Sequence, residues 1–231
     1  MRLTKSLIGL ALATALAPAV AAEPLAPVAR VDAGRVVHAG EGVNIRVPAS
    51  ATYVGSDRFT LYGVADAEIH VFAEADAKRR LRRLYWIQFE SYLPSKPELA
   101  YDYADGNRRV VLWGTPTWLR AGPVSTRGPV RAGSDRERVI ALLKRAGLTI
   151  PSEVMNVRLV QLLDDPKGTG KGRRELMLIY SEDLAPSGRT LAELTADSKP
   201  GAAWQPLEQP LIDRATTALS VQRNSNVPAR R

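Results

Sequence analysis

The chain lacks cysteine entirely and contains only two histidines among its 231 residues. Without cysteine there are no disulfide bonds, no cysteine-based zinc or redox sites and no thiolate nucleophile. Two histidines, His38 and His70, are too few for a histidine-rich metal site, and no G-x-S-x-G elbow presents a serine to either of them. We therefore expect neither a metal ion nor another cofactor, and the sequence identifies no catalytic residue.

Long apolar runs are also missing after the N-terminus, where no stretch approaches the roughly 20 apolar residues of a membrane-spanning helix. The N-terminus itself has the pattern of a secretory signal, because Arg2 and Lys5 precede an uncharged run and small residues follow at Ala21 and Ala22. We predict that residues 1–22 are a signal peptide of bacterial type. The mature protein is then exported to a periplasm or beyond the cell, soluble and with no transmembrane segment.

A nucleotide-binding loop is absent as well. Residues 165–172 resemble the pattern G-x-x-x-x-G-K-[ST], but Asp165 stands where the pattern needs glycine, and Gly172 stands where it needs serine or threonine. The segment also connects two predicted strands, whereas the motif leads from a strand into a helix. We therefore predict that it is a hairpin connection.

Positive charge is present in excess: the net charge is +8, and removal of Arg2 and Lys5 with the signal leaves +6. Basic residues gather at positions 78–83, 127–138 and 167–174. No aromatic-interleaved motif accompanies them, so no specific nucleic-acid partner is expected. These runs are typical of solvated turns, and the alternative is that they bind anionic glycans or lipid headgroups of a cell envelope.

We predict one α+β domain over residues 35–222, with a flexible leader at residues 23–34 and a disordered tail at residues 223–231. The expected fold is an antiparallel, curved β-sheet of about six to eight strands, with one well-capped helix and one or two C-terminal helices. The well-capped helix is predicted to begin at Ser134, where Glu137 completes a capping box.

Further elements follow from alternation, turn residues and capping patterns. Thr190 with Glu193 predicts a short capped helix. Asp105-Gly106 predicts a tight hairpin that pairs Asp102 with Arg109. The remaining predictions are strands at residues 43–47, 58–64, 154–163 and 174–180, a long surface loop at 114–133 and a last helix at 206–221.

The chain is organised around a long predicted hairpin at residues 66–92, whose two arms each alternate between apolar and polar side chains. Keeping apolar residues opposite apolar ones predicts that Glu74 faces Arg82, that His70 faces Trp86, and that Asp66 faces Glu90. One polar and aromatic sheet face results. Its members are the candidate ligand-binding residues Asp66, Glu68, His70, Trp86, Gln88, Glu90 and Tyr92.

Three functions are compatible with this face. The favoured hypothesis is a non-catalytic binding or interaction module that uses Trp86, Gln88 and Glu90 to bind a small amphipathic or anionic molecule. The first alternative is a carboxylate-dependent hydrolase or isomerase with Glu90 or Asp66 as the base. The second is a structural envelope protein that holds anionic glycans or headgroups through its basic loops. Metal binding by acidic residues and His70 on this strand, or burial of Trp86 in a second core, are the competing interpretations of the same pattern.

Overall fold

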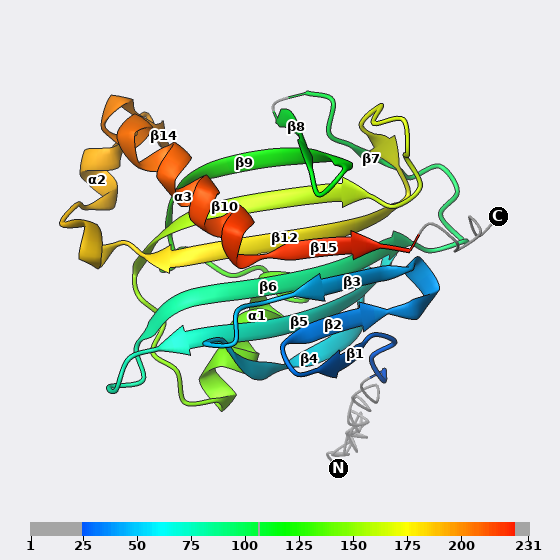
Figure 1. Cartoon of the computed structure of the whole chain (residues 1–231), viewed down its shortest axis with the longest axis horizontal. Coiled ribbons are helices and arrows are strands. Elements are labelled where there is room, and N and C mark those ends of the chain that lie inside the picture. Colours follow the sequence, from blue (N-terminus) through cyan, green and yellow to red (C-terminus); the bar gives the residue numbers. More distant parts are fainter. Residues whose placement is uncertain (1–24, 106, 225–231) are drawn as a thin grey trace, which may run out of the picture.

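A computed structural model describes residues 25–105 and 107–224 (Figure 1). This part of the chain is built mainly from antiparallel strands, with three α-helices, which confirms the sheet-rich α+β class. The predicted signal peptide and most of the predicted tail lie outside the described residues. Within those residues, no helix has the length and apolar character needed to cross a membrane.

The larger of two main sheets has seven strands in the order β4-β5-β6-β12-β10-β9-β8, and every pairing in it is antiparallel. The predicted six to eight strands describe this sheet but not the whole described chain, which has further strands. The seven strands are β4 (Thr52–Leu61), β5 (Ala65–Ala75), β6 (Leu81–Tyr92), β8 (Arg108–Leu112), β9 (Thr115–Ser125), β10 (Glu153–Leu162) and β12 (Arg174–Asp183).

A second, four-stranded sheet was not predicted. It has the order β1-β2-β3-β15 and joins the two ends of the described chain. Its strands are β1 (Arg30–Asp32), β2 (Arg35–His38), β3 (Val43–Arg46) and β15 (Ser220–Arg223). Two short pairs complete the strands: β7 (Tyr101–Asp102) with β11 (Lys171–Gly172), and β13 (Thr195–Ala196) with β14 (Lys199–Pro200).

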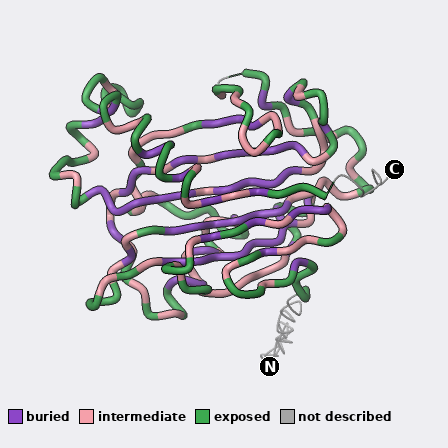
Figure 2. Tube along the Cα trace, in the orientation of Figure 1, coloured by how far each residue is buried: buried purple, intermediate pink, exposed green. Residues whose placement is uncertain are grey.

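Both faces of the large sheet are covered (Figure 1). The small sheet and α3 (Gln205–Ala218) lie on one side, here called the α3 face, and α1 (Asp135–Arg145) lies on the other, the α1 face. Buried residues therefore follow one another along the long strands (Figure 2). The remaining helices are α2 (Leu191–Leu194) and three short 3-10 turns, η1 (Ala39–Glu41), η2 (Ala185–Ser187) and η3 (Ala202–Trp204).

The predicted helix starts are confirmed. At α1, Ser134 Oγ accepts a hydrogen bond from the Glu137 backbone N–H at 3.1 Å, while the Glu137 carboxylate accepts from the N–H of Gly133 and not from that of Ser134. At α2, Thr190 and Glu193 form the complete reciprocal box. Each cap satisfies backbone N–H groups that the first helical turn leaves free.

The register of the long hairpin differs from the prediction by one residue. Ala75 pairs with Leu81, as expected, but a β-bulge follows and Glu74 pairs with Arg83, so that Arg82 has no partner on β5. A one-residue shift exchanges the faces of one strand relative to the other. His70 consequently pairs with Ile87, and Val71 pairs with Trp86.

The predicted pairing of Asp102 with Arg109 is wrong, while Gly106 of the predicted turn lies outside the described residues. β7 pairs with β11, and β8 pairs with β9, which occupies the first half of the predicted surface loop. β8 and β9 meet at a two-residue turn, Trp113-Gly114, whose φ angles are 50° and 75°. Positive φ at both central residues is the type I′ geometry that matches strand twist.

The two predicted end segments also need correction. The flexible leader is wrong from Ala29 onward, because Ala29 is buried and β1 begins at Arg30. The last helix ends at Ala218, and the chain then enters β15, which continues to Arg223 and so extends the folded part past the predicted domain boundary. In β15, Val221 packs into the core between the small sheet and the large sheet.

Candidate functional site

The predicted ligand-binding residues do not share one face. Because of the bulge in β6, Glu68 and His70 lie on the α3 face with Phe89, whereas Trp86 lies on the α1 face with Ile69. The strand alternation places Asp66 with the first group and Gln88, Glu90 and Tyr92 with the second. The single polar and aromatic face is therefore wrong, and its two halves have separate surroundings.

Glu68 and His70 form a buried structural pair on the α3 face. The Glu68 carboxylate accepts hydrogen bonds from the backbone N–H groups of Val28 and Ala29, each at 2.7 Å, and lies 2.8 Å from His70 Nε2. Burial opposes ionisation, but these hydrogen bonds hold the pKa of Glu68 below its ordinary value. The pair thus anchors the N-terminal segment to the large sheet.

Asp66 is also occupied by a protein partner, since Arg58 Nη2 lies 2.6 Å from its carboxylate. Within residues 25–105 and 107–224, no group of three or more acidic or histidine side chains is arranged to hold a metal ion. The metal interpretation of Asp66, Glu68 and His70 has no support in this geometry.

Trp86 lines a cavity of about 720 Å³ on the α1 face, here called the Trp86 cavity. One wall is α1, another is the segment around residues 126–130, and the floor is the large sheet where β6, β12 and β10 lie side by side. The apolar lining comes from Leu81, Leu84, Trp86, Val124, Val130, Val139, Ile140, Leu143, Ile150, Pro151, Val154 and Ile179. The neutral polar lining comes from Thr126, Ser152, Asn156 and Ser181.

The charged side chains around the Trp86 cavity are all basic. Arg80, Arg127, Arg136 and Lys144 line it, and no acidic residue of the described chain does. Arg136 Nη2 donates to the carbonyl of Thr126 at 2.7 Å, which fixes α1 to the opposite wall. An apolar floor beneath a basic rim is complementary to a molecule with an apolar body and a negative charge.

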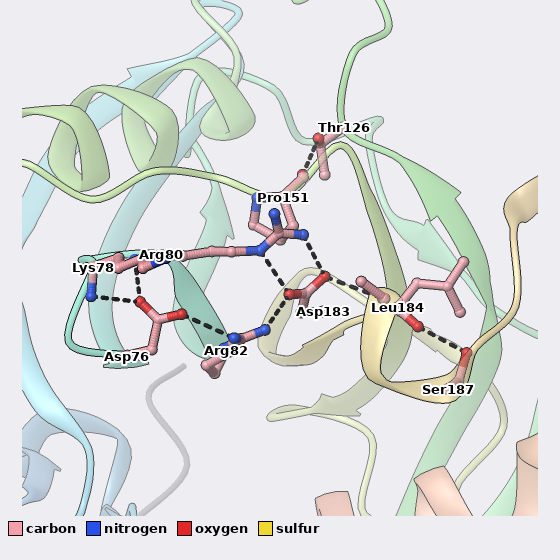
Figure 3. Close-up of polar contacts among 10 residues, drawn as sticks. Asp76, Lys78, Arg80, Arg82, Thr126, Pro151, Asp183, Leu184 and Ser187 are labelled. Atoms are coloured by element: carbon pink, nitrogen blue, oxygen red, sulfur yellow. Dashed lines mark hydrogen bonds and ion pairs between the residues drawn. The ribbon is translucent and has the colours of Figure 1, made fainter.

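The basic turn before β6 is largely neutralised within the protein (Figure 3). The buried Asp183 carboxylate accepts two hydrogen bonds from Arg80, at 2.8 and 3.0 Å, and one from Arg82 at 2.8 Å. Burial opposes its ionisation, but Arg80, the backbone N–H of Ala185 and Arg82 hold the pKa of Asp183 below its ordinary value. Arg79 donates to two carbonyls just past the end of α1, at Ala146 and Gly147, where the helix dipole favours a cation.

Farther along the α1 face, Glu90 lies opposite a second carboxylate that sequence reasoning missed. Glu175 of β12 is its direct partner in the sheet and is only 2% exposed. Tyr101 Oη donates to Glu90 and Tyr103 Oη donates to Glu175, each at 2.6 Å. Arg158 Nη2 donates to the Tyr103 oxygen at 2.7 Å.

The two carboxylates perturb each other. Burial, followed by repulsion from Glu90, raises the pKa of Glu175 to about 7. Burial also raises the pKa of Glu90, against the hydrogen bonds from Tyr101 and Gln88. Gln88 in turn accepts from Trp86 Nε1 at 3.0 Å, so the pair is connected to the floor of the Trp86 cavity.

Glu175 had a visible signal in the sequence. It alternates with Leu176 and Leu178 in a predicted strand, which places it on one face with Met177 and Ile179. The sequence did not reveal that β12 pairs with β6, because 81 residues lie between the end of β6 at Tyr92 and the start of β12 at Arg174.

Comparison of the chain with protein-family models, with curated proteins and with solved structures found no match.

Proposed function

We propose that the protein is a non-catalytic binding module and that the Trp86 cavity holds a small anionic amphiphile. The observation that carries this proposal is the composition of the cavity lining: an apolar floor that includes Trp86, and four basic residues with no acidic residue of the described chain. Its volume of about 720 Å³ lies within the usual range of roughly 300–1,000 Å³ for small-molecule sites.

The carboxylate-dependent enzyme is supported less well. Asp66 and Glu90 lie on opposite faces of the large sheet, so they form no acid–base couple, and Asp66 is paired with Arg58. Glu90 and Glu175 are a couple with raised pKa values, but neither lines the Trp86 cavity. Glu90 lines a smaller hollow of about 340 Å³ at the other end of the strand, but Glu175 does not.

The envelope-binding alternative is weakened by the internal partners of the basic runs. Arg80 and Arg82 are held by Asp183, as described above, and Arg83 contacts Glu74 at 2.7 Å. In the run at residues 167–174, Arg174 contacts Glu41 at 2.9 Å, and Arg173 donates to backbone carbonyls between Leu93 and Leu99. A side chain that already satisfies a protein carboxylate loses part of its attraction for an external anion.

Calorimetric titration with decyl phosphate below its micelle concentration tests the proposal, with decanol and decyltrimethylammonium as neutral and cationic counterparts. We expect decyl phosphate to bind most tightly and the cation least. Trp86→Ala should weaken binding of decyl phosphate by about tenfold or more, because a large aromatic contact is lost. Trp113→Ala is the matched control, since Trp113 lies in the β8–β9 turn and does not line the cavity.

Three outcomes would contradict the proposal. Equal affinity for the three decyl compounds would show that the basic rim does not select charge. Unchanged affinity in Trp86→Ala, with the fold intact by circular dichroism, would place any binding elsewhere on the molecule. Turnover of a substrate that is lost in Glu90→Gln would favour the enzyme instead.

A further inference from the structure

A second hollow, of about 540 Å³, lies on the α1 face next to the Trp86 cavity. It is formed by β9, β10 and the segment that carries the β13–β14 pair, and it is here called the Arg120 hollow. Asn156 and Val124 line both this hollow and the Trp86 cavity, so the two spaces adjoin. The other lining residues are Arg120, Ala121, Gly122, Pro123, Ser125, Arg158, Leu191, Thr195, Ser198 and Pro200.

The two charged residues in the Arg120 hollow are both arginines. Arg120 of β9 and Arg158 of β10 are direct partners in the sheet, and the strand alternation puts them on the same face. Like charges placed directly opposite each other on neighbouring strands destabilise a sheet. Nevertheless, neither arginine forms an ion pair with any residue in the described ranges, and no acidic residue of those ranges lines the hollow.

Arg158 is held in place by neutral groups. Its Nη2 donates to Tyr103 Oη at 2.7 Å, its Nε contacts Met177 Sδ at 3.0 Å, and its guanidinium lies 5.2 Å from the centre of the Tyr103 ring. These contacts orient the guanidinium without a direct ion pair; its nearby negative charges are Glu175, which it reaches through Tyr103, and Glu90. Arg120 is exposed and makes no side-chain hydrogen bond to another described residue.

We propose that Arg120 and Arg158 form an anion subsite that binds the acidic head of the amphiphile whose apolar part lies against Trp86. This inference rests on the proposed function and adds the place and chemistry of head-group recognition. An anion between the guanidinium groups converts their repulsion into two charge-assisted contacts. The planar donor fork of arginine suits a phosphate or carboxylate in particular, and the neutral polar groups of Ser125, Asn156, Thr195 and Ser198 surround the same space.

The basic rim of the Trp86 cavity is the competing place for the head. Arg80 and Arg136 have donors already engaged by Asp183 and by backbone carbonyls. Lys144 and Arg127 remain as candidates there. These two places for the head group can be distinguished, because different single substitutions should weaken the binding of decyl phosphate in each case.

Calorimetric titration of Arg120→Gln with decyl phosphate distinguishes the arginine subsite from the rim of the Trp86 cavity. The fold should persist, since Arg120 is exposed, and the affinity for decyl phosphate should fall about tenfold while that for decanol stays unchanged. Arg158→Lys, which keeps the charge but removes the fork, should weaken decyl phosphate binding as well. Arg108→Gln is the matched control, because Arg108 is exposed on neighbouring β8 and faces the opposite side of the sheet with Leu119.

The results distinguish a failure of the proposed function from a failure of the arginine subsite. If decyl phosphate does not bind the wild-type protein, the proposed function fails and the subsite fails with it. If decyl phosphate binds and depends on Trp86, but Arg120→Gln and Arg158→Lys bind it normally while Lys144→Gln does not, the subsite is overturned and the proposed function stands. Ethyl phosphate should bind at least about tenfold more weakly than decyl phosphate; equal binding would overturn the amphiphile and indicate a site for free phosphate.

Discussion

Glu90 and Glu175 place two carboxyl groups side by side on the α1 face, and the charge of Arg158 acts on both. Tyr101 and Tyr103 each donate to one of them, so their hydrogen-bonding needs are met by neutral groups. Repulsion between two neighbouring carboxylates in a buried setting favours a state in which one of them keeps its proton. This pair consequently makes stability depend on pH.

Glu175→Gln tests that dependence. The pKa of Glu175 rises from 4.5 to about 7 on folding, so between these values the native state binds more protons than the unfolded state. The contribution of Glu175 to the free energy of unfolding is therefore fully present below pH 4.5 and is lost as the pH rises through 7. We expect Glu175→Gln to remove that loss and to be more stable than the wild type at pH 8, by up to about 3 kcal/mol.

Urea denaturation at pH 5, 6, 7 and 8 measures the effect as a growing difference between the free energies of unfolding of variant and wild type. Glu98→Gln is a control for charge removal alone, since Glu98 is exposed and lies outside the pair. Parallel pH profiles for wild type and Glu175→Gln would mean that Glu175 titrates as an ordinary glutamate.

Helix α1 begins at an N-cap that the sequence predicts, and its position forms one wall of the Trp86 cavity. Ser134 is 5% exposed and accepts the Glu137 N–H, and α1 then supplies Val139, Ile140 and Leu143 to the wall of the Trp86 cavity. Ser134→Ala should lower the free energy of unfolding by about 1 kcal/mol, the usual cost of losing an N-cap. Thermal and urea unfolding measure this, with Ser95→Ala at an exposed serine as control; an unchanged free energy would show that the cap contributes nothing.

Capping and alternation patterns located α1, α2 and most long strands correctly, but the turn residues predicted the wrong strand partner for β8. Ala33-Gly34, Tyr62-Gly63 and Trp113-Gly114 all have positive φ at both residues, although none begins with Asn or Asp. Asp105-Gly106 has the stronger local preference for such a turn, yet β8 pairs elsewhere. The pairing of whole strands thus overrides the preference of two residues.

The faces of the central hairpin were wrong for a related reason. Alternation specifies register strongly when one face is buried and the other is solvated. Here both faces are covered, and Glu68 and His70 are as buried as Phe89 because they satisfy each other and the N-terminal backbone. The bulge at Arg82, which decides the faces, is placed by Asp183 and Asp76 through ion pairs that local sequence does not reveal.

Across the whole molecule, the aromatic member of the site could be found in the sequence, whereas its surroundings could not. Trp86 stood out as an aromatic residue on a polar strand. The cavity around it depends on α1 and the segment near residues 126–130, and the arginine pair depends on β9, which was predicted to be loop. These are contacts between distant segments, so single-strand patterns carry no information about them.

The attachment of the N-terminal segment is a property of the whole molecule that rests on one side chain. Glu68 accepts the backbone N–H groups of Val28 and Ala29 and contacts His70, so Glu68→Gln turns one of its acceptors into a donor and leaves a buried group unsatisfied. A loss of stability of about 1–3 kcal/mol is expected. Hydrogen exchange of the backbone amides over residues 25–34 should accelerate before the rest of the sheet opens.

Acid should have the same effect on the wild-type protein. Because the pKa of Glu68 is lowered on folding, its contribution to stability is present above its ordinary value of 4.5 and is lost as the pH falls through the lower folded value. Peptides covering residues 25–34 should therefore lose protection as the pH falls in the wild type, whereas in Glu68→Gln their protection should be low at every pH and change little. Asp57→Asn, at a carboxylate that contacts Arg138 on the other side of the sheet, is the control. If Asp57→Asn loosened the segment as much as Glu68→Gln, the attachment would reflect general stability, not the Glu68 carboxylate.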